Sequence, residues 1–178
     1  MSFVRVIGLA AMSIFTLSPV FSQTPMLLSS SSIVDGKILK QHACTSQGGS
    51  NVSVQLSVKN LPADAKYLSI VMDDPDALPV AGKNWVHWNL FNTPINGKLD
   101  VAAGAAPSGD AGRASGGSKS YEGMCPPNGT HTYRFAVFAT KDKVDVAGFF
   151  GPAAMTIEDF ESKFSSSILG TAKINGKF

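Results

Sequence analysis

The chain has 178 residues, of which 44% are hydrophobic and 16% are charged. That length suits one domain with a targeting segment, and the apolar content is high enough for a packed core, which excludes a largely disordered chain. The formal net charge is only +2, and the lysines and arginines form no cluster. We therefore expect no nucleic-acid partner, because such binding depends on a basic surface.

The N-terminal residues have the order of a secretory signal peptide. Arg5 is the one charge of this segment, residues 6–17 are almost wholly apolar, and Pro19 then interrupts the apolar run. Val20 and Ser22 fit the positions three and one before a cleavage that follows Ser22.

A membrane anchor is the alternative reading of this segment. The apolar run is shorter than the about 20 residues that span a bilayer, so the anchor is disfavoured. We therefore predict a signal peptide at 1–22 and one mature domain at 23–178. The protein is then periplasmic or secreted, with no transmembrane segment after the signal is removed.

Alternation of apolar and polar residues predicts strands over most of the mature chain. The clearest runs are residues 52–58, 66–72, 85–91 and 132–140, and Asp35-Gly36 marks a hairpin turn near the start. In the last of these runs, the two-residue period of a strand places His131 and Tyr133 on the same side. The same rule, applied to the third run, predicts one face formed by Trp85, His87, Asn89 and Phe91.

A single helix is predicted near the C-terminus. Thr156 is a suitable N-cap, and apolar residues recur at helical spacing up to Ile168, with Gly170 as a C-cap. Asn175-Gly176 indicates a final turn, and the Gly-, Ala- and Ser-rich residues 102–120 indicate a long loop. These patterns together predict an all-β fold, a two-sheet antiparallel β-sandwich with a peripheral C-terminal helix and long loops.

Three clusters carry possible chemistry. The first is Asp73-Asp74-Pro75-Asp76, which on its own is most simply an Asp-rich turn. The second is Trp85-Val86-His87-Trp88, whose histidine is, on its own, most simply a packed core residue. The third is the stiff loop Gly123-Met124-Cys125-Pro126-Pro127, followed by His131 and Tyr133.

Taken in order, these clusters resemble the signature regions of the phosphatidylethanolamine-binding family, which includes the Raf kinase inhibitor proteins. The first signature reads Asp74-Pro75-Asp76-Ala77 followed by Trp85-Val86-His87. The second reads Gly123-Met124-Cys125-Pro126-Pro127 followed by His131-Thr132-Tyr133. The Cys-Pro-Pro form and the short chain resemble the bacterial Raf-kinase-inhibitor-like branch.

The resemblance implies a small pocket that binds a phosphate-like anion or a phospholipid head group, without a metal or another cofactor. A protein partner that the chain inhibits or modulates is a further implication. Leu78 and Met124 depart from the family pattern, and we expect them to add apolar bulk at the pocket rim. The implied ligand-binding residues are Asp74, Asp76, Trp85, His87, Gly123, Cys125, Pro126, His131 and Tyr133.

The residue types suit such a ligand. The imidazoles of His87 and His131 and the hydroxyl of Tyr133 can each donate a hydrogen bond to a phosphate oxygen. Asp74 would repel an anion, so its expected role is to orient a histidine and favour the imidazolium form. A charge-assisted bond from imidazolium to phosphate is stronger than a neutral one.

An enzymatic alternative uses the same residues. Asp74, His87 and His131 could hold a metal as two histidines and one carboxylate, and Cys125 could act as a nucleophile beside a histidine. We expect a binding protein rather than this metal- or Cys-dependent hydrolase, because no other nucleophile accompanies the histidines.

The two cysteines, Cys44 and Cys125, bear on that choice. In an exported protein two cysteines can form one disulfide, which would remove the Cys125 thiol. Two separate buried thiols are the alternative, and sequence alone does not decide between them.

Overall fold

The structure is a computed structural model that describes residues 24–147 and 153–178. The predicted signal peptide at 1–22 lies outside the described residues. None of the described helices is long and apolar enough to cross a bilayer.

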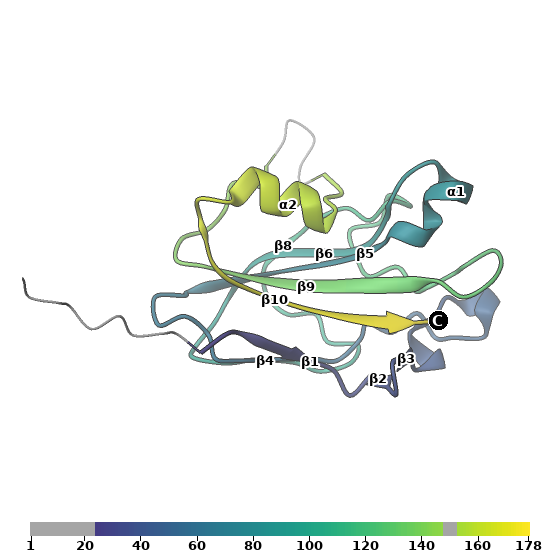
Figure 1. The fold of residues 1–178 in the computed structure, drawn as a ribbon, viewed down its shortest axis with the longest axis horizontal. Helices are drawn as coiled ribbons and strands as arrows, with labels where there is room; N and C mark the ends of the chain where they lie inside the picture. Colours follow the sequence, from purple (N-terminus) through teal and green to yellow (C-terminus); the bar gives the residue numbers. More distant parts are fainter. Residues whose placement is uncertain (1–23, 148–152) are drawn as a thin grey trace, which may run out of the picture.

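Two β-sheets and one helix form three layers (Figure 1). The larger sheet has seven strands in the order β2-β3-β10-β9-β5-β6-β8, and the smaller has the order β1-β4-β7. All pairings are antiparallel except the contact of β3 with β10. The strands are β1 (Leu27–Ser29), β2 (Ile33–Val34), β3 (Lys37–Ile38), β4 (Leu56–Lys59), β5 (Tyr67–Asp74), β6 (Trp85–Pro94), β7 (Leu99–Val101), β8 (Asp110–Ala111), β9 (Thr132–Thr140) and β10 (Ile168–Lys177). The predicted all-β sandwich is confirmed.

The helical segments are short. The α-helices are α1 (Leu78–Ala81) and α2 (Ile157–Phe164), and the 3-10 turns are η1 (Lys40–His42), η2 (Thr45–Gln47) and η3 (Pro75–Ala77). Helix α2 begins, as predicted, at Thr156, whose side chain accepts from the Asp159 N–H in a capping box. The sequence did not predict α1, which is only one turn long.

Two apolar cores lie on opposite faces of the large sheet. Between the sheets, Leu56 and Val58 of β4 pack with buried side chains of β5 and β9. On the other face, Phe160 of α2 stacks on Phe138 and Phe91, with ring centroids 4.4 and 5.9 Å away. Because both faces are covered, every residue of β5 after Tyr67 is buried.

A charged network fixes α2 to the sheet. Asp73 is fully buried, and its carboxylate accepts two hydrogen bonds from the Arg134 guanidinium, each 2.8 Å long. The same carboxylate accepts from the Ile157 N–H at 3.0 Å, and Arg134 also contacts Glu158. An anion beside the first N–H groups of a helix is stabilised there. Asp73 therefore holds the start of α2 against the sheet.

The C-terminal segment differs from the prediction. Helix α2 ends at Phe164, and Gly170 and the Asn175-Gly176 pair lie inside the long strand β10. Packing favours glycine at both positions: a Cβ atom on Gly176 would lie 2.5 Å from Ile38 Cγ1, and one on Gly170 would lie 2.7 Å from Met26 Sδ, so that the methionine side chain would have to move. Their sequence signal was therefore misread as a helix cap and a turn.

Two further predictions of local structure can be compared with the strands. The Asp35-Gly36 hairpin joins β2 and β3, and both residues have positive φ angles of 49° and 75°, as the turn requires. The strand predicted at residues 52–58 is shorter, since β4 begins only at Leu56.

Of the two alternatives for Cys44 and Cys125 that the sequence left open, the structure has the disulfide, with 5.5 Å between the Cα atoms. It joins the turn that holds η2 to the Gly123–Pro127 loop. The alternative of two separate buried thiols is wrong for this structure.

Candidate functional site

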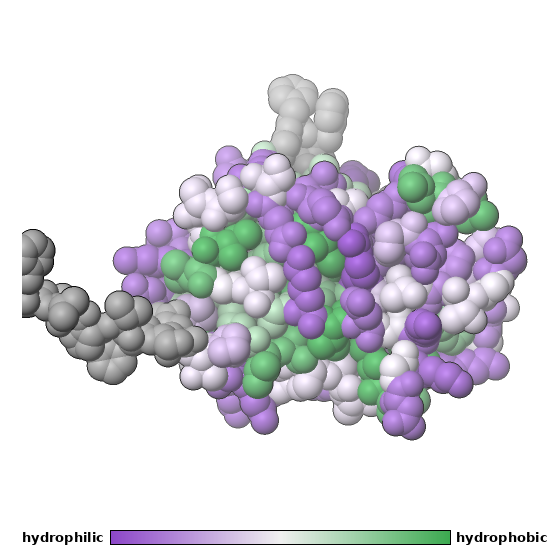
Figure 2. Space-filling view, in the orientation of Figure 1, coloured by the Kyte–Doolittle hydropathy of each residue, from purple (hydrophilic) through white to green (hydrophobic). Residues whose placement is uncertain are grey.

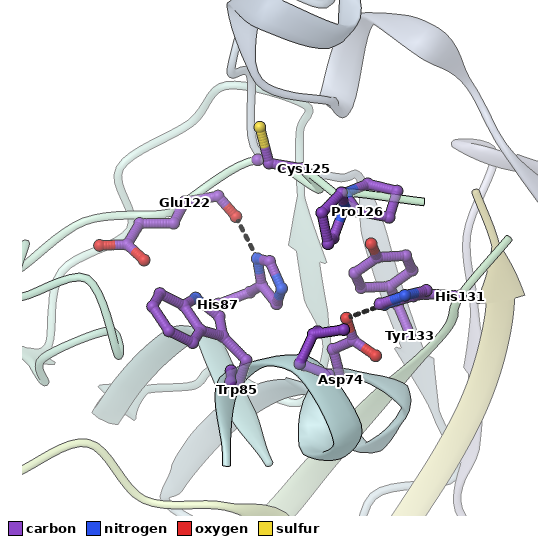
Figure 3. A pocket seen from close by; sticks show the side chains of 13 residues that line it. Asp74, Trp85, His87, Glu122, Cys125, Pro126, His131 and Tyr133 are labelled. Carbon is purple, nitrogen blue, oxygen red and sulfur yellow. Dashed lines mark hydrogen bonds and ion pairs between the residues drawn. The ribbon is translucent and has the colours of Figure 1, made fainter. Parts of the chain in front are cut away.

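A pocket of about 360 Å³ opens where β5 ends and where β6 and β9 begin (Figure 3). Its floor is polar and its walls are largely apolar. The lining residues are Asp74, Ala77, Val80, Ala81, Trp85, His87, Glu122, Gly123, Cys125, Pro126, Pro127, His131 and Tyr133. The structure thus brings together all the predicted site residues except Asp76.

Asp74 orients His131. Strand β5 ends at Asp74, whose Oδ2 lies 2.7 Å from His131 Nδ1, and both side chains are almost completely buried. The carboxylate accepts this hydrogen bond, so Nδ1 carries a proton and Nε2 is left for a ligand. This hydrogen bond is the geometry that the predicted orienting role of Asp74 requires.

Asp76 acts on the backbone around the site. Its N–H donates to Asp74 Oδ1 at 3.0 Å, and its own carboxylate accepts from the Thr132 N–H at 2.7 Å. Thr132 lies between His131 and Tyr133, so this contact fastens the start of β9 to the end of β5. Asp76 lies outside the pocket lining, and its contacts position the backbone next to His131 and Tyr133.

An irregularity in β6 decides where His87 points. Met72 lies opposite Trp88 and Asp73 lies opposite Val86, so His87 is the extra residue of a β-bulge. The bulge changes the alternation of faces along β6 at this residue.

The predicted face of Trp85, His87, Asn89 and Phe91 is therefore wrong. Trp85 and His87 line the pocket. Phe91 instead packs beneath α2, and Asn89 donates to a backbone carbonyl that precedes this helix. Without the bulge, His87 could not share a face with the end of β5 while Phe91 faces α2.

His87 is buried and held by a backbone carbonyl. Its Nδ1 lies 2.8 Å from the Glu122 carbonyl oxygen, which can only accept, so Nδ1 carries the proton. Burial lowers the pKa of His87, and the bond to Glu122 and nearby carboxylates oppose that effect only in part. A neutral ring with its proton on Nδ1 presents Nε2 as an acceptor toward the pocket.

Tyr133 lies between the two histidines. Its ring meets the His87 ring edge-on at 5.2 Å and stacks near the His131 ring at 6.3 Å. Its hydroxyl is buried and has no hydrogen-bond partner among the described residues. Burial raises the pKa of Tyr133, so the hydroxyl keeps its proton and remains a donor. The predicted placement of His131 and Tyr133 on one side holds in the structure (Figure 3).

The Gly123–Pro127 loop forms one wall of the pocket. A Cβ atom on Gly123 would lie 2.6 Å from the Cys44 nitrogen, so only glycine fits there. Met124 is fully buried, and its Sδ lies 3.2 Å from the Tyr121 hydroxyl oxygen. The expectation that Met124 adds bulk at the rim is therefore wrong.

Helix α1 forms the opposite wall. Val80 and Ala81 line the pocket, whereas Leu78 lies outside the lining and is 56% exposed. Leu78 thus does not narrow the pocket either. Figure 2 shows hydrophobic atoms on the surface over α1, at the upper right of the view.

Five lining residues were not predicted from the sequence: Ala77, Val80, Ala81, Glu122 and Pro127. Pro127 and Ala77 belong to the quoted motifs and could have been included. Glu122 holds His87 through its backbone carbonyl, and a backbone group leaves no signal in residue type.

Comparison with known proteins identifies the family. The sequence profile of the phosphatidylethanolamine-binding protein family matches residues 29–178, so the chain belongs to this family. A homologue of known structure from Chlamydia trachomatis superposes with a TM-score of 0.71 at 27% identity, covering 88% of this chain and 98% of that chain.

Within the family, the chain belongs to the branch of the Escherichia coli proteins YbhB and YbcL. It is 33% identical to YbhB over 155 residues, covering 80% of this chain and 97% of that protein. A UPF0098 protein of Methanothermobacter thermautotrophicus is 34% identical over 148 residues, covering 80% and 91%. YbcL shares the fold, with a TM-score of 0.71.

The lowered pKa of His87 predicts a pH dependence of stability. The unfolded chain takes up a proton near pH 6.5, but the folded protein resists it, so the free energy of unfolding falls as the pH drops below about 6.5. Urea unfolding from pH 8 to pH 5, in buffers without phosphate, measures the slope. His87→Asn, whose amide can still donate to the Glu122 carbonyl, should flatten it; equal slopes for both proteins would contradict the assignment.

Proposed function

We propose that this chain is an exported protein that binds a phosphate-like anion or a phospholipid head group in the pocket of His87, His131 and Tyr133. The observation that carries the proposal is the Tyr133 hydroxyl, a buried donor inside the pocket without a partner among the described residues. Leaving such a group unpaired costs about 1–3 kcal/mol, which a ligand oxygen would recover.

The remaining polar groups suit one phosphoryl group. His131 offers Nε2 while Asp74 holds its Nδ1, and His87 offers Nε2 while the Glu122 carbonyl holds its Nδ1. No lysine or arginine belongs to the described lining, so recognition depends on directed hydrogen bonds rather than on excess positive charge.

Binding should involve a proton. Neutral His87 is an acceptor, so a fully deprotonated phosphate would face its lone pair. Either His87 takes up a proton, or the ligand arrives as a monoanion whose P–OH donates to His87. In both routes the complex holds one proton more than the separate protein, with neutral His87, and the phosphate dianion hold together. This modifies the expectation that the imidazoles of His87 and His131 both donate to the ligand.

The size and walls of the pocket favour a substituted phosphate. A cavity of about 360 Å³ exceeds the needs of one small anion, and Val80, Ala81, Pro126 and Pro127 supply apolar contact. A phosphomonoester can place its phosphoryl group on the polar floor and its substituent against these walls. We include no protein partner in the proposal, because no described surface identifies one.

The hydrolase alternative receives less support. Cys125 is bonded to Cys44, so the oxidised protein has no thiolate at this position. Among residues 24–147 and 153–178, no group of three or more His, Cys, Asp or Glu side chains is arranged to hold a metal ion. A binding experiment therefore has priority over an activity screen.

Replacing Tyr133 by Phe should separate binding from stability. The variant loses one donor to a charged ligand, so its affinity for phenyl phosphate should fall about 10-fold or more. Its free energy of unfolding should stay equal or rise, because an unpaired buried hydroxyl is removed. Calorimetric titration and urea unfolding give the two quantities.

Tyr121→Phe is the matched control for that variant. The Tyr121 hydroxyl donates to the His42 carbonyl at 2.8 Å, away from the pocket. Its loss should lower the free energy of unfolding by about 0.5–1.5 kcal/mol and leave affinity unchanged. Unchanged affinity in Tyr133→Phe would refute the pocket assignment.

The proton requirement predicts that phenyl phosphate binds more tightly at pH 6 than at pH 8. Uptake of one proton changes the dissociation constant by at most about tenfold per pH unit. In His87→Gln the amide can donate to the ligand without a proton, so the slope should be smaller. Affinity that is independent of pH in the wild-type protein would contradict this mechanism.

Export is part of the proposal. It rests on the order of Arg5, the apolar residues 6–17 and the small residue Ser22, and a Mycobacterium tuberculosis relative, 32% identical over 165 residues, is named as a candidate lipoprotein. Full-length protein expressed in a bacterium should appear in the periplasm or medium with Gln23 as its first residue. A chain that lacks 1–22 should stay in the cytoplasm; an uncleaved cytoplasmic full-length protein would contradict export.

A further inference from the structure

The disulfide forms part of the pocket. Cys125 lines it and is solvent-exposed, whereas Cys44 lies on the turn that leads into η2. A disulfide that only stabilises a fold is usually shielded, and an exposed one is open to thiol exchange. Because this bond lies in the wall of the proposed ligand pocket, we looked for a role beyond stability.

A hydroxyl group lies beside both sulfur atoms. Ser46 Oγ is 3.1 Å from Cys44 Sγ and 3.1 Å from Cys125 Sγ. When a thiolate attacks one sulfur of a disulfide, the other sulfur leaves as a thiolate. A hydrogen bond from Ser46 can stabilise that leaving group, whichever cysteine is attacked.

The bonded loop carries the groups that position the ligand contacts. Glu122, which holds His87, directly precedes Gly123, and Pro126 and Pro127 follow Cys125 as apolar walls. Without the disulfide, this loop is joined to the Cys44 turn by the burial of Met124 and Ala43 in one apolar core and by hydrogen bonds. Three of them are Cys44 N–H to the Met124 carbonyl at 3.0 Å, Gln47 Nε2 to the Pro126 carbonyl at 2.8 Å, and Gly123 N–H to Asn51 Oδ1 at 2.6 Å.

We propose that Cys44–Cys125 is a reversible thiol-exchange site for a dithiol reductant, and that its oxidation state sets the affinity of the pocket for phosphomonoesters. A dithiol supplies two electrons and two protons: its sulfurs form a disulfide while the S–S bond here becomes two thiols. The second half of this inference rests on the proposed function.

The physical basis is the order of the pocket wall. In the oxidised protein, the Glu122 carbonyl and the two prolines are held in place before the ligand arrives. In the reduced protein, the wall samples more positions, and binding must order it again, which weakens affinity. The two core clusters do not contain Cys44 or Cys125, so the fold itself remains.

The test measures binding of phenyl phosphate to oxidised protein and to protein reduced by dithiothreitol. We expect the dissociation constant to rise tenfold or more on reduction. Changes in amide chemical shift should be confined to the Cys44 turn and residues 122–127. Cys44→Ser, which leaves the pocket-lining Cys125 in place, should bind like the reduced protein.

Ser46→Ala tests the exchange site separately. This variant should bind phenyl phosphate like the wild type when oxidised, but dithiothreitol should reduce its disulfide several-fold more slowly. Ser50→Ala, which changes an exposed serine beyond the disulfide turn, is the control and should be reduced at the wild-type rate. An unchanged rate in Ser46→Ala would overturn the role of the hydroxyl.

The remaining outcomes are also decisive. Equal affinity of the folded oxidised and reduced proteins would overturn the redox control of binding. Global unfolding on reduction would overturn it as well, because the bond would then hold the whole fold rather than the wall. Failure of the oxidised protein to bind any phosphomonoester would instead refute the proposed function, and the reduction rates would still test the exchange site.

Discussion

Two adjacent buried carboxylates at the end of β5 organise this molecule. The alternation of a strand sends Asp73 to the helix face of the sheet and Asp74 to the pocket face. A buried carboxylate must be paired, and each has its own cation or imidazole: Arg134 for Asp73 and His131 for Asp74. The same two residues therefore attach α2 on one side and set the geometry of the pocket on the other, so fold and site are linked through one short segment.

The pocket is polar without being basic. Its two imidazoles are each held at Nδ1, by Asp74 for His131 and by the Glu122 carbonyl for His87, and Tyr133 lies between them. In the proposed function, such a site would select its ligand by geometry and by protonation state, since the groups cannot rearrange to suit another ligand. It differs from a surface cluster of lysines, which would attract many anions and would weaken with salt.

The sequence predicted what depends on local pattern or on motif. The residues of β5 and β9, the N-cap at Thr156 and the pairing of His131 with Tyr133 all follow from period or spacing. What it could not predict depends on distant contacts. Gly170 and Gly176 indicate a cap and a turn until the neighbouring side chains are known, and the carbonyl that holds His87 belongs to a residue of unrelated type.

The bulge at His87 also bears on how related chains diverge. Val86 and Trp88 lie opposite consecutive residues of β5, so deletion of His87 would leave a regular ladder and an intact core. A lineage could thus lose the imidazole through a single-codon deletion and keep the fold. Among diverged relatives, the number of residues between the positions of Asp74 and Trp88 would then distinguish two groups. Chains with the full number retain the pocket histidine, and chains that are one residue shorter retain only the fold.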